Sequence, residues 1–80
     1  MPSSADMNIV GTRVRIARLR KKPVLTQDAL AGKLAAQSVS LDRAAVSKIE
    51  TGIRCVLDYE VVALAKALGV TTGWLLGGKE

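Results

Sequence analysis

The chain has 80 residues, of which 49% are hydrophobic and 24% charged. This length suits one small domain, and the apolar fraction is too high for a disordered chain. We expect a packed core built from Val, Ile, Leu and Ala, because aromatic residues are nearly absent. The net charge of +5 favours anionic partners, nucleic acid before any other.

Residues suited to catalysis or metal binding are scarce. The chain has no His, which is the commonest general base and metal ligand. Its one cysteine, Cys55, can form neither an internal disulfide nor a Cys-based zinc site. No pairing of a nucleophile with a base is visible, so we expect no enzyme activity, no metal and no cofactor.

Three features of the sequence indicate where in the cell the protein is located. Residues 1–7 are small and polar and lack the pattern of a signal peptide, so we interpret them as a flexible arm before one domain of residues 8–80. No apolar stretch reaches the roughly 18 residues that span a bilayer. A lone cysteine fits a reducing cytosol. We therefore expect a cytoplasmic protein without membrane association.

Two helices are predicted in the first half of the chain. One runs from about Asn8 to Lys22, and Pro23 ends it by keeping the preceding residue out of the helical region. The other starts after Thr26, whose hydroxyl suits an N-cap, and frays near Gln37. Apolar residues recur at helical spacing in both: Val10, Val14 and Ala17, then Leu30 and Leu34.

Three further helices are predicted in the second half. One follows the N-cap Asp42 and ends at Thr51-Gly52, with Ala45 or Val46, then Ile49, facing inward. Another spans about Asp58 to Leu68, and Gly69 caps it. Thr71 or Thr72 caps a last single turn. No segment alternates like a strand, so the sequence predicts an all-α domain of five short helices.

Three segments carry a resemblance to a known family. They are LTQDALA at 25–31, AVSKIETG at 45–52 and LAKALGV at 64–70, and the basic first helix fits with them. In this order they resemble the helix-turn-helix of the Cro/phage-repressor class, also called the XRE family, over most of residues 9–76. The resemblance implies a lambda-repressor-like DNA-binding domain, with the helix-turn-helix formed by the second and third helices.

Two departures from the family pattern concern connections. Residues 36–41 are about five residues longer than the usual short turn, so they either lengthen the second helix or form a loop. Residues 21–25 are also slightly longer and carry a Pro where many relatives have Gly.

The resemblance places the third helix in the DNA major groove, with base contacts from Arg43, Ala44, Ser47 and Lys48. Arg43 is the best base reader, because a guanidinium bonds guanine in a bidentate way. Lys48 suits a phosphate better than a base. The alternative for Arg43 is an ordinary solvated side chain beside an N-cap, and for Ala44 a simple helix former.

Phosphate contacts are implied for Gln27 at a helix start, and for Thr51 and Arg54 just beyond the third helix. An ordinary exposed loop charge is the alternative for Arg54. The family often pairs the positions of Arg18 and Glu50 in a partly buried ion pair, which implies a structural role for both.

The C-terminal residues Trp74, Leu75 and Leu76 either cover the core or, if exposed, form a dimer contact. For Tyr59 and Cys55 we expect packing and no chemistry.

The leading hypothesis is a sequence-specific binder of double-stranded DNA that represses transcription. One recognition helix reads too few base pairs to select a genomic site, so we expect a homodimer on an inverted-repeat operator, with the contact around Trp74 to Leu76 or at the end of the fourth helix. The alternative is an antitoxin or interaction module that binds a protein partner with the same scaffold.

Overall fold

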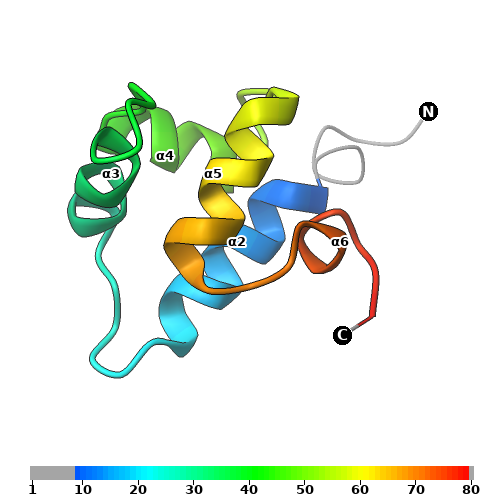
Figure 1. Ribbon diagram of the computed structural model, residues 1–80. Coiled ribbons are helices and arrows are strands. Elements are labelled where there is room, and N and C mark those ends of the chain that lie inside the picture. Colours follow the sequence, from blue (N-terminus) through cyan, green and yellow to red (C-terminus); the bar gives the residue numbers. More distant parts are fainter. Residues whose placement is uncertain (1–8, 80) are drawn as a thin grey trace.

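The computed structural model describes residues 9–79, and within them the chain forms five helices and no strand (Figure 1). The helices are α2 (Ile9–Arg20), α3 (Gln27–Ala35), α4 (Arg43–Glu50), α5 (Asp58–Leu68) and α6 (Thr72–Leu75). The predicted all-α fold is therefore confirmed. The predicted arm of residues 1–7 lies outside the described residues. In the described part, no helix combines the length and apolar character needed to cross a membrane.

Local side-chain chemistry sets where the helices begin. Thr26, Asp42 and Thr71 each accept, through a side-chain oxygen, a hydrogen bond from the backbone N–H three residues further on, at 3.0, 2.8 and 3.0 Å. These bonds satisfy donors that the first turn of a helix leaves unpaired. Gly69, with φ of 71°, ends α5 in the left-handed conformation that glycine adopts without strain. The starts of α3, α4 and α6 and the end of α5 therefore follow from single residues.

The end of α2 differs from the prediction by two residues. The helix stops at Arg20, whereas the sequence pattern extended it to Lys22. The backbone N–H groups of Lys21 and Leu25 both donate to the carbonyl oxygen of Arg18, at 3.4 and 3.2 Å. The chain therefore turns over residues 21–25 and is tied back to the last turn of α2 before it enters α3, so Lys21 and Lys22 lie beyond the helix.

Residues 36–41 form a loop rather than an extra turn of α3. The helix ends at Ala35, and Ser38 turns the chain with a φ of 62°. The N–H of Val39 then donates to the carbonyl of Leu34, at 3.0 Å. Val39 and Leu41 are both buried, so the alternating pattern of this segment serves to anchor the loop in the core.

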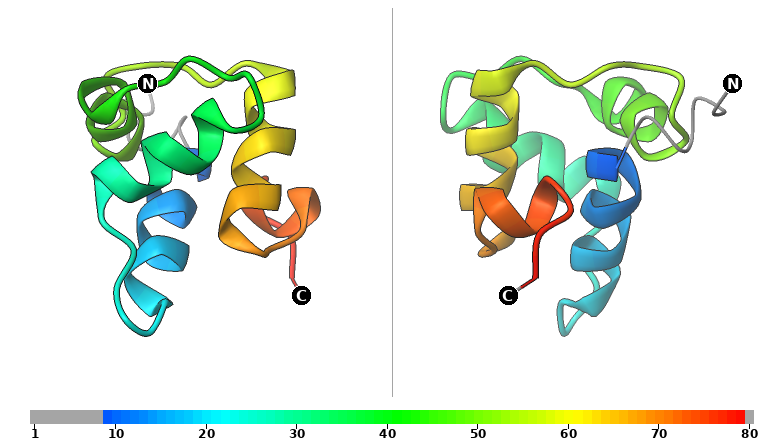
Figure 2. Two further views of the ribbon diagram at one scale, coloured as in Figure 1. Left: turned by 60° about the vertical axis from the view of Figure 1, so that its left-hand side comes forward. Right: turned by 90° about the vertical axis from the view of Figure 1, so that its right-hand side faces the viewer.

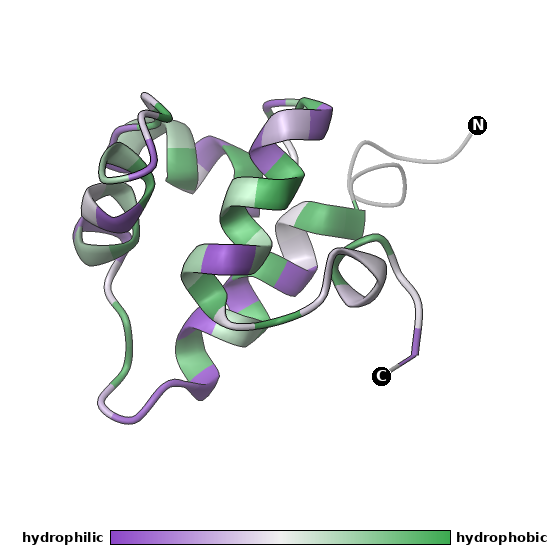
Figure 3. Cartoon of the chain, in the orientation of Figure 1, coloured by the Kyte–Doolittle hydropathy of each residue, from purple (hydrophilic) through white to green (hydrophobic). Residues whose placement is uncertain are grey.

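The core lies where the apolar stripes of the helices converge. Helix α5 packs against α2, α3 and α6, while α4 packs against α2 and α3 (Figures 1 and 2). Figure 3 shows hydrophobic residues recurring along these helices, whereas the connection after α2 begins hydrophilic and becomes hydrophobic before α3. The largest fully buried side chains come from all five helices: Val14, Leu30, Leu34, Val46, Ile49, Leu64, Leu68 and Leu75.

The C-terminal helix covers the core, as one of the two predicted roles of Trp74 and Leu75 requires. Trp74 and Leu75 are 7% and 0% exposed, and only Leu76 of this group faces solvent. The guanidinium of Arg13 lies 4.7 Å from the centre of the Trp74 ring and donates to the Trp74 carbonyl at 3.1 Å. Trp74 and Leu75 therefore serve to cover the core, and of the three residues only Leu76 is available for the predicted dimer contact, which stays a prediction.

The expected packing of Tyr59 and Cys55 was also wrong. Both are exposed, with Tyr59 at 57%. Tyr59 belongs to the first turn of α5, where the buried positions are taken by Glu60 and Val61. A large aromatic side chain is usually buried, but Tyr59 lies on the side of α5 that faces away from the core.

The N-cap of α4 gives a test of this local account. Asp42→Ala is expected to lower the free energy of unfolding by about 1 kcal/mol, because the N–H of Ala45 loses its partner. Asp28→Ala removes a first-turn carboxylate that caps nothing and is expected to cost less, about 0.3–1 kcal/mol through the helix dipole. Urea denaturation of both variants measures the difference. Equal losses would contradict a capping role for Asp42.

Candidate DNA interface

Helix α4 is held by polar contacts at its two ends and by apolar contacts along one side. It has eight residues, of which Val46 and Ile49 are buried. Asp42 caps its start, and Glu50, its last residue, points into a polar cluster between helices. An isolated helix this short is not stable in water, so these contacts keep it folded and in place.

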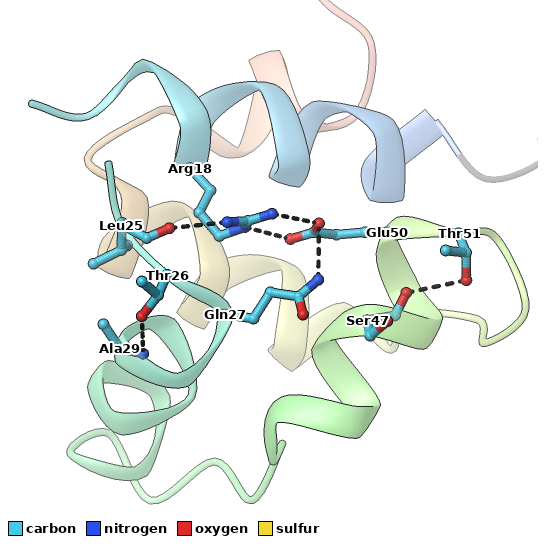
Figure 4. A network of polar contacts seen from close by, with 8 residues as sticks. All are labelled: Arg18, Leu25, Thr26, Gln27, Ala29, Ser47, Glu50 and Thr51. Carbon is cyan, nitrogen blue, oxygen red and sulfur yellow. Dashed lines mark hydrogen bonds and ion pairs between the residues drawn. The ribbon is translucent and has the colours of Figure 1, made fainter. Parts of the chain in front are cut away.

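The carboxylate of Glu50 joins three helices (Figure 4). Arg18 on α2 donates to both of its oxygens, from Nε at 2.7 Å and from Nη2 at 2.9 Å. Gln27 at the start of α3 donates from Nε2 to Oε1, at 3.3 Å. The side chains of Arg18 and Glu50 are 10% and 2% exposed. This is the ion pair that the resemblance implied, and Gln27 adds a third member to it.

The remaining donor capacity of Arg18 is also used. Its Nη1 donates to the carbonyl oxygen of Leu25 at 3.0 Å, which ties the connection before α3 to the same cluster. The hydrogen bond to Glu50 raises the pKa of Arg18 further above its ordinary value, against the opposing effect of burial. Arg18 therefore stays charged at every pH at which the protein folds, and within the described residues no buried side-chain polar atom lacks a partner.

The opposite side of α4 faces solvent. Arg43, Ala44 and Lys48 are exposed and Ser47 is half-buried. A shallow hollow runs between the starts of α3 and α4, lined by Gln27, Asp28, Asp42, Arg43, Ala44 and Ser47. The structure therefore brings three of the four predicted base readers to one surface beside the start of α3, with Lys48 one turn further along α4.

Two predicted phosphate ligands have other bonds in this structure. The Nε2 of Gln27 donates to Glu50, so its side chain is part of the cluster that holds α4. The hydroxyl of Thr51 donates to the carbonyl of Ser47 at 3.0 Å and closes the last turn of that helix. A phosphate contact by the Thr51 hydroxyl requires that this bond be given up.

Arg54 has a structural partner that the sequence analysis did not anticipate. Its guanidinium donates to both oxygens of Glu60, at 2.9 and 3.0 Å, and to the carbonyl of Cys55 at 2.9 Å. Glu60 is 2% exposed and also accepts from the N–H of Leu57 at 2.9 Å. The pair thus fastens the loop after α4 to the first turn of α5. The sequence offered one signal for the role of Glu60: a Glu three residues after the N-cap often accepts a hydrogen bond from the N-cap backbone N–H. It offered none for the pairing with Arg54.

Two residues at this surface were missed. Arg15 on α2 and Asp28 on α3 both line a second hollow, which Arg43 shares. Arg15 is exposed and lies three residues before Arg18, so the helical spacing that places Arg18 against α4 also places Arg15 toward the same edge. Asp28 puts a negative charge beside Arg43. This surface therefore carries charges of both signs.

Comparison with known proteins identifies the family. A family model described as helix-turn-helix matches residues 16–75, and the chain belongs to this family, whose type is that of the Cro/phage repressors. At the level of the family it is a DNA-binding regulator of transcription, a class that is not typically enzymatic. The matched residues include α3 and α4, so the lambda-repressor-like fold and the helix-turn-helix are confirmed. Neither the curated proteins nor the solved structures gave a match.

Removal of the Glu50 carboxylate tests the cluster. Glu50→Ala leaves Arg18 charged and buried without its partner, so we expect a loss of about 3–5 kcal/mol in the free energy of unfolding. The double variant Arg18→Met, Glu50→Leu is expected to lose less than Glu50→Ala alone, because no charge is left stranded. Chemical denaturation measures both, and a greater loss in the double variant would contradict this account.

The second ion pair predicts a dependence of stability on pH. The hydrogen bond from Arg54 lowers the pKa of Glu60 below its ordinary value of 4.5, although burial alone raises it. A lowered pKa stabilises the folded chain above pH 4.5, and that stabilisation is lost as the pH falls through the folded-state pKa. Glu60→Gln is expected to be less stable at neutral pH and to lose less on acidification. Denaturation curves across this range check both, and parallel acid losses would contradict them.

Proposed function

We propose that the chain represses transcription by binding a specific double-stranded DNA site with α4 in the major groove. The observation that carries the proposal is the exposed side of α4, which presents Arg43 and Ala44 outward while Asp42 and Glu50 hold the helix at its ends. A helix fixed in this way meets the groove as a rigid body, so its side chains keep their register on the bases.

The proposed roles follow from the geometry of each group. Arg43 reads a guanine with its forked guanidinium, and Ala44 and Ser47 contact neighbouring bases. Lys48, further along α4, pairs with a base edge or a phosphate. The backbone N–H of Gln27 at the start of α3 is placed to bind a phosphate, because the first N–H groups of a helix lack partners within it. We assign Arg54 to the support of the loop after α4, since Glu60 takes both arms of its guanidinium.

We further propose that two copies bind an inverted repeat. One helix of eight residues contacts only a few base pairs, which is too little to select one site among many competitors. Two copies related by a two-fold axis double the sequence that is read. The protein-interaction module, or antitoxin, stays as the alternative function, because the surface exposes several large apolar side chains.

The dependence of DNA affinity on salt tests whether the proposed surface meets DNA. Each phosphate that a cation neutralises adds about −0.9 to the slope of log K against log salt. Lys48→Ala is expected to reduce the steepness of that slope by about one phosphate. Lys66→Ala, which removes another exposed Lys, on α5, is expected to leave it unchanged. Titration of duplex DNA with each variant gives the slopes. The absence of duplex binding at low salt would refute the proposal and favour a protein partner.

The identity of the base reader can be tested by site selection. Arg43→Ala is expected to relax the base preference at one position in each half-site and to cost about 1–3 kcal/mol there. Gln27→Ala keeps the backbone N–H but removes the hydrogen bond to Glu50 that helps to hold α4, so it is expected to weaken binding to every sequence alike. Selection from randomised duplexes with each variant measures both effects. If Arg43→Ala keeps the preferred site and lowers all affinities uniformly, Arg43 contacts the backbone instead.

A further inference from the structure

Helix α2 has a second apolar side, which faces away from the core. Its buried side packs against α4, α5 and α6. Ile9, Ile16 and Leu19 lie on the other side and are 47%, 36% and 45% exposed, and we call them the outer face of α2. Ile16 lies about 160° around the helix axis from the buried Arg18, at about 100° per residue. In the right-hand view of Figure 2, α2 lies at the edge of the molecule, so this face points away from the other helices.

The spacing of the outer face is that of a coiled-coil seam. Ile9 and Ile16 are seven residues apart, which makes them a positions of a heptad. Thr12 and Leu19 each follow three residues later, at the d positions, and Thr12 is exposed as well. Side chains in such a row lose their contact with water only when a second helix packs its own row against them. The spacing therefore indicates a helical partner.

Positive charge flanks this seam on both sides. Arg13 and Arg20 occupy the e positions of the heptad, and Arg15 occupies the g position. The guanidinium groups of Arg13 and Arg20 lie 4.7 and 5.6 Å from the centre of the Trp74 ring, on the side of α6. Arg15, by contrast, lines a hollow together with residues of α3 and α4. Both edges of the outer face are therefore basic.

The same part of the chain lacks negative charge. Positions 9–27 contain no Asp or Glu, and they contain six basic residues: Arg13, Arg15, Arg18, Arg20, Lys21 and Lys22. Arg18 is paired with Glu50, and within residues 9–79 none of the other five forms an ion pair. A partner that brings carboxylates to both edges of the seam therefore meets cations that no ion pair of the described chain already uses.

We propose that the outer face of α2 binds an acidic amphipathic helix of a protein partner. In a paired seam the e and g residues of the two helices face each other, so cations there select carboxylates on the partner. A second copy of this chain would place cation against cation, which disfavours self-pairing. The DNA backbone supplies negative charge but no apolar surface to cover Ile16 and Leu19. Three apolar side chains also make too narrow a stripe for insertion into a membrane surface.

Three synthetic peptides test the chemistry of the partner. The first is an amphipathic helix with Leu at the a and d positions and Glu at the e and g positions. The second carries Lys in place of each Glu, and the third carries Ser in place of each Leu. The full chain is titrated into each labelled peptide, and binding is followed by fluorescence anisotropy. Only the first peptide is expected to bind saturably, and salt is expected to weaken its binding because it screens the exposed charges.

Two pairs of variants test the place of binding. Leu19→Ser is expected to weaken binding of the first peptide by about tenfold, whereas Val62→Ser, at a comparably exposed apolar residue on α5, is expected to leave it unchanged. Arg20→Glu is expected to weaken it as well, whereas Lys66→Glu, which reverses an exposed charge on α5, is expected to have little effect. All four positions are exposed, and urea denaturation of each variant checks that it folds.

The proposal is overturned if the first peptide does not bind at low salt. It is also overturned if the first and third peptides bind equally, which shows attraction by charge alone, or if Leu19→Ser and Val62→Ser have the same effect. Vesicles of anionic lipid test the other occupant: vesicle binding that Leu19→Ser weakens, without peptide binding, assigns the face to a membrane instead. None of these measurements contains DNA, so the proposal stands or fails independently of the proposed function.

Discussion

Three helices of this domain meet at one buried carboxylate, that of Glu50. Arg18 from α2 grips both of its oxygens and Gln27 from α3 adds a third hydrogen bond. Arg18 also holds the connection before α3 through the Leu25 carbonyl. The gain in net stability from a buried ion pair is small, because its charges lose their hydration. What the cluster supplies is direction, because the forked guanidinium of Arg18 bonds both oxygens of Glu50 only over a narrow range of relative positions of α2 and α4.

Helix α4 depends on that direction because few of its own side chains are buried. Only Val46 and Ile49 of α4 are buried, and apolar contacts alone permit the helix to slide or tilt. The Asp42 cap fixes its start and the Glu50 cluster its end, so Arg43 and its neighbours project to one side. The Arg54–Glu60 pair acts in the same way on the next segment of the chain, because it fastens the loop after α4 to the first turn of α5. Two bidentate Arg–Glu contacts thus hold α4 and the loop that follows it.

The sequence predicted what local chemistry decides. The N-caps Thr26 and Asp42 and the helix end at Gly69 follow from single residues, and the buried stripes follow from spacing. It did not predict features that depend on neighbours distant in the chain. The early end of α2 reflects the turn of residues 21–25, whose N–H groups at Lys21 and Leu25 donate to the Arg18 carbonyl. The exposure of Tyr59 reflects which side of α5 meets the core. The Arg54–Glu60 pair was not predicted, because the position of a charged loop residue relative to its partner depends on the path of the folded loop.

The charge cluster, rather than the apolar core, holds the end of α4 in place. Native-state hydrogen exchange on Arg18→Met tests this directly, because it reports the opening of each helix separately. The backbone amides of α4, Val46 among them, are expected to exchange faster, while those in the middle of α5, such as Leu64, are expected to keep their protection. Equal loss of protection in α4 and α5, or unchanged exchange throughout α4, would contradict it.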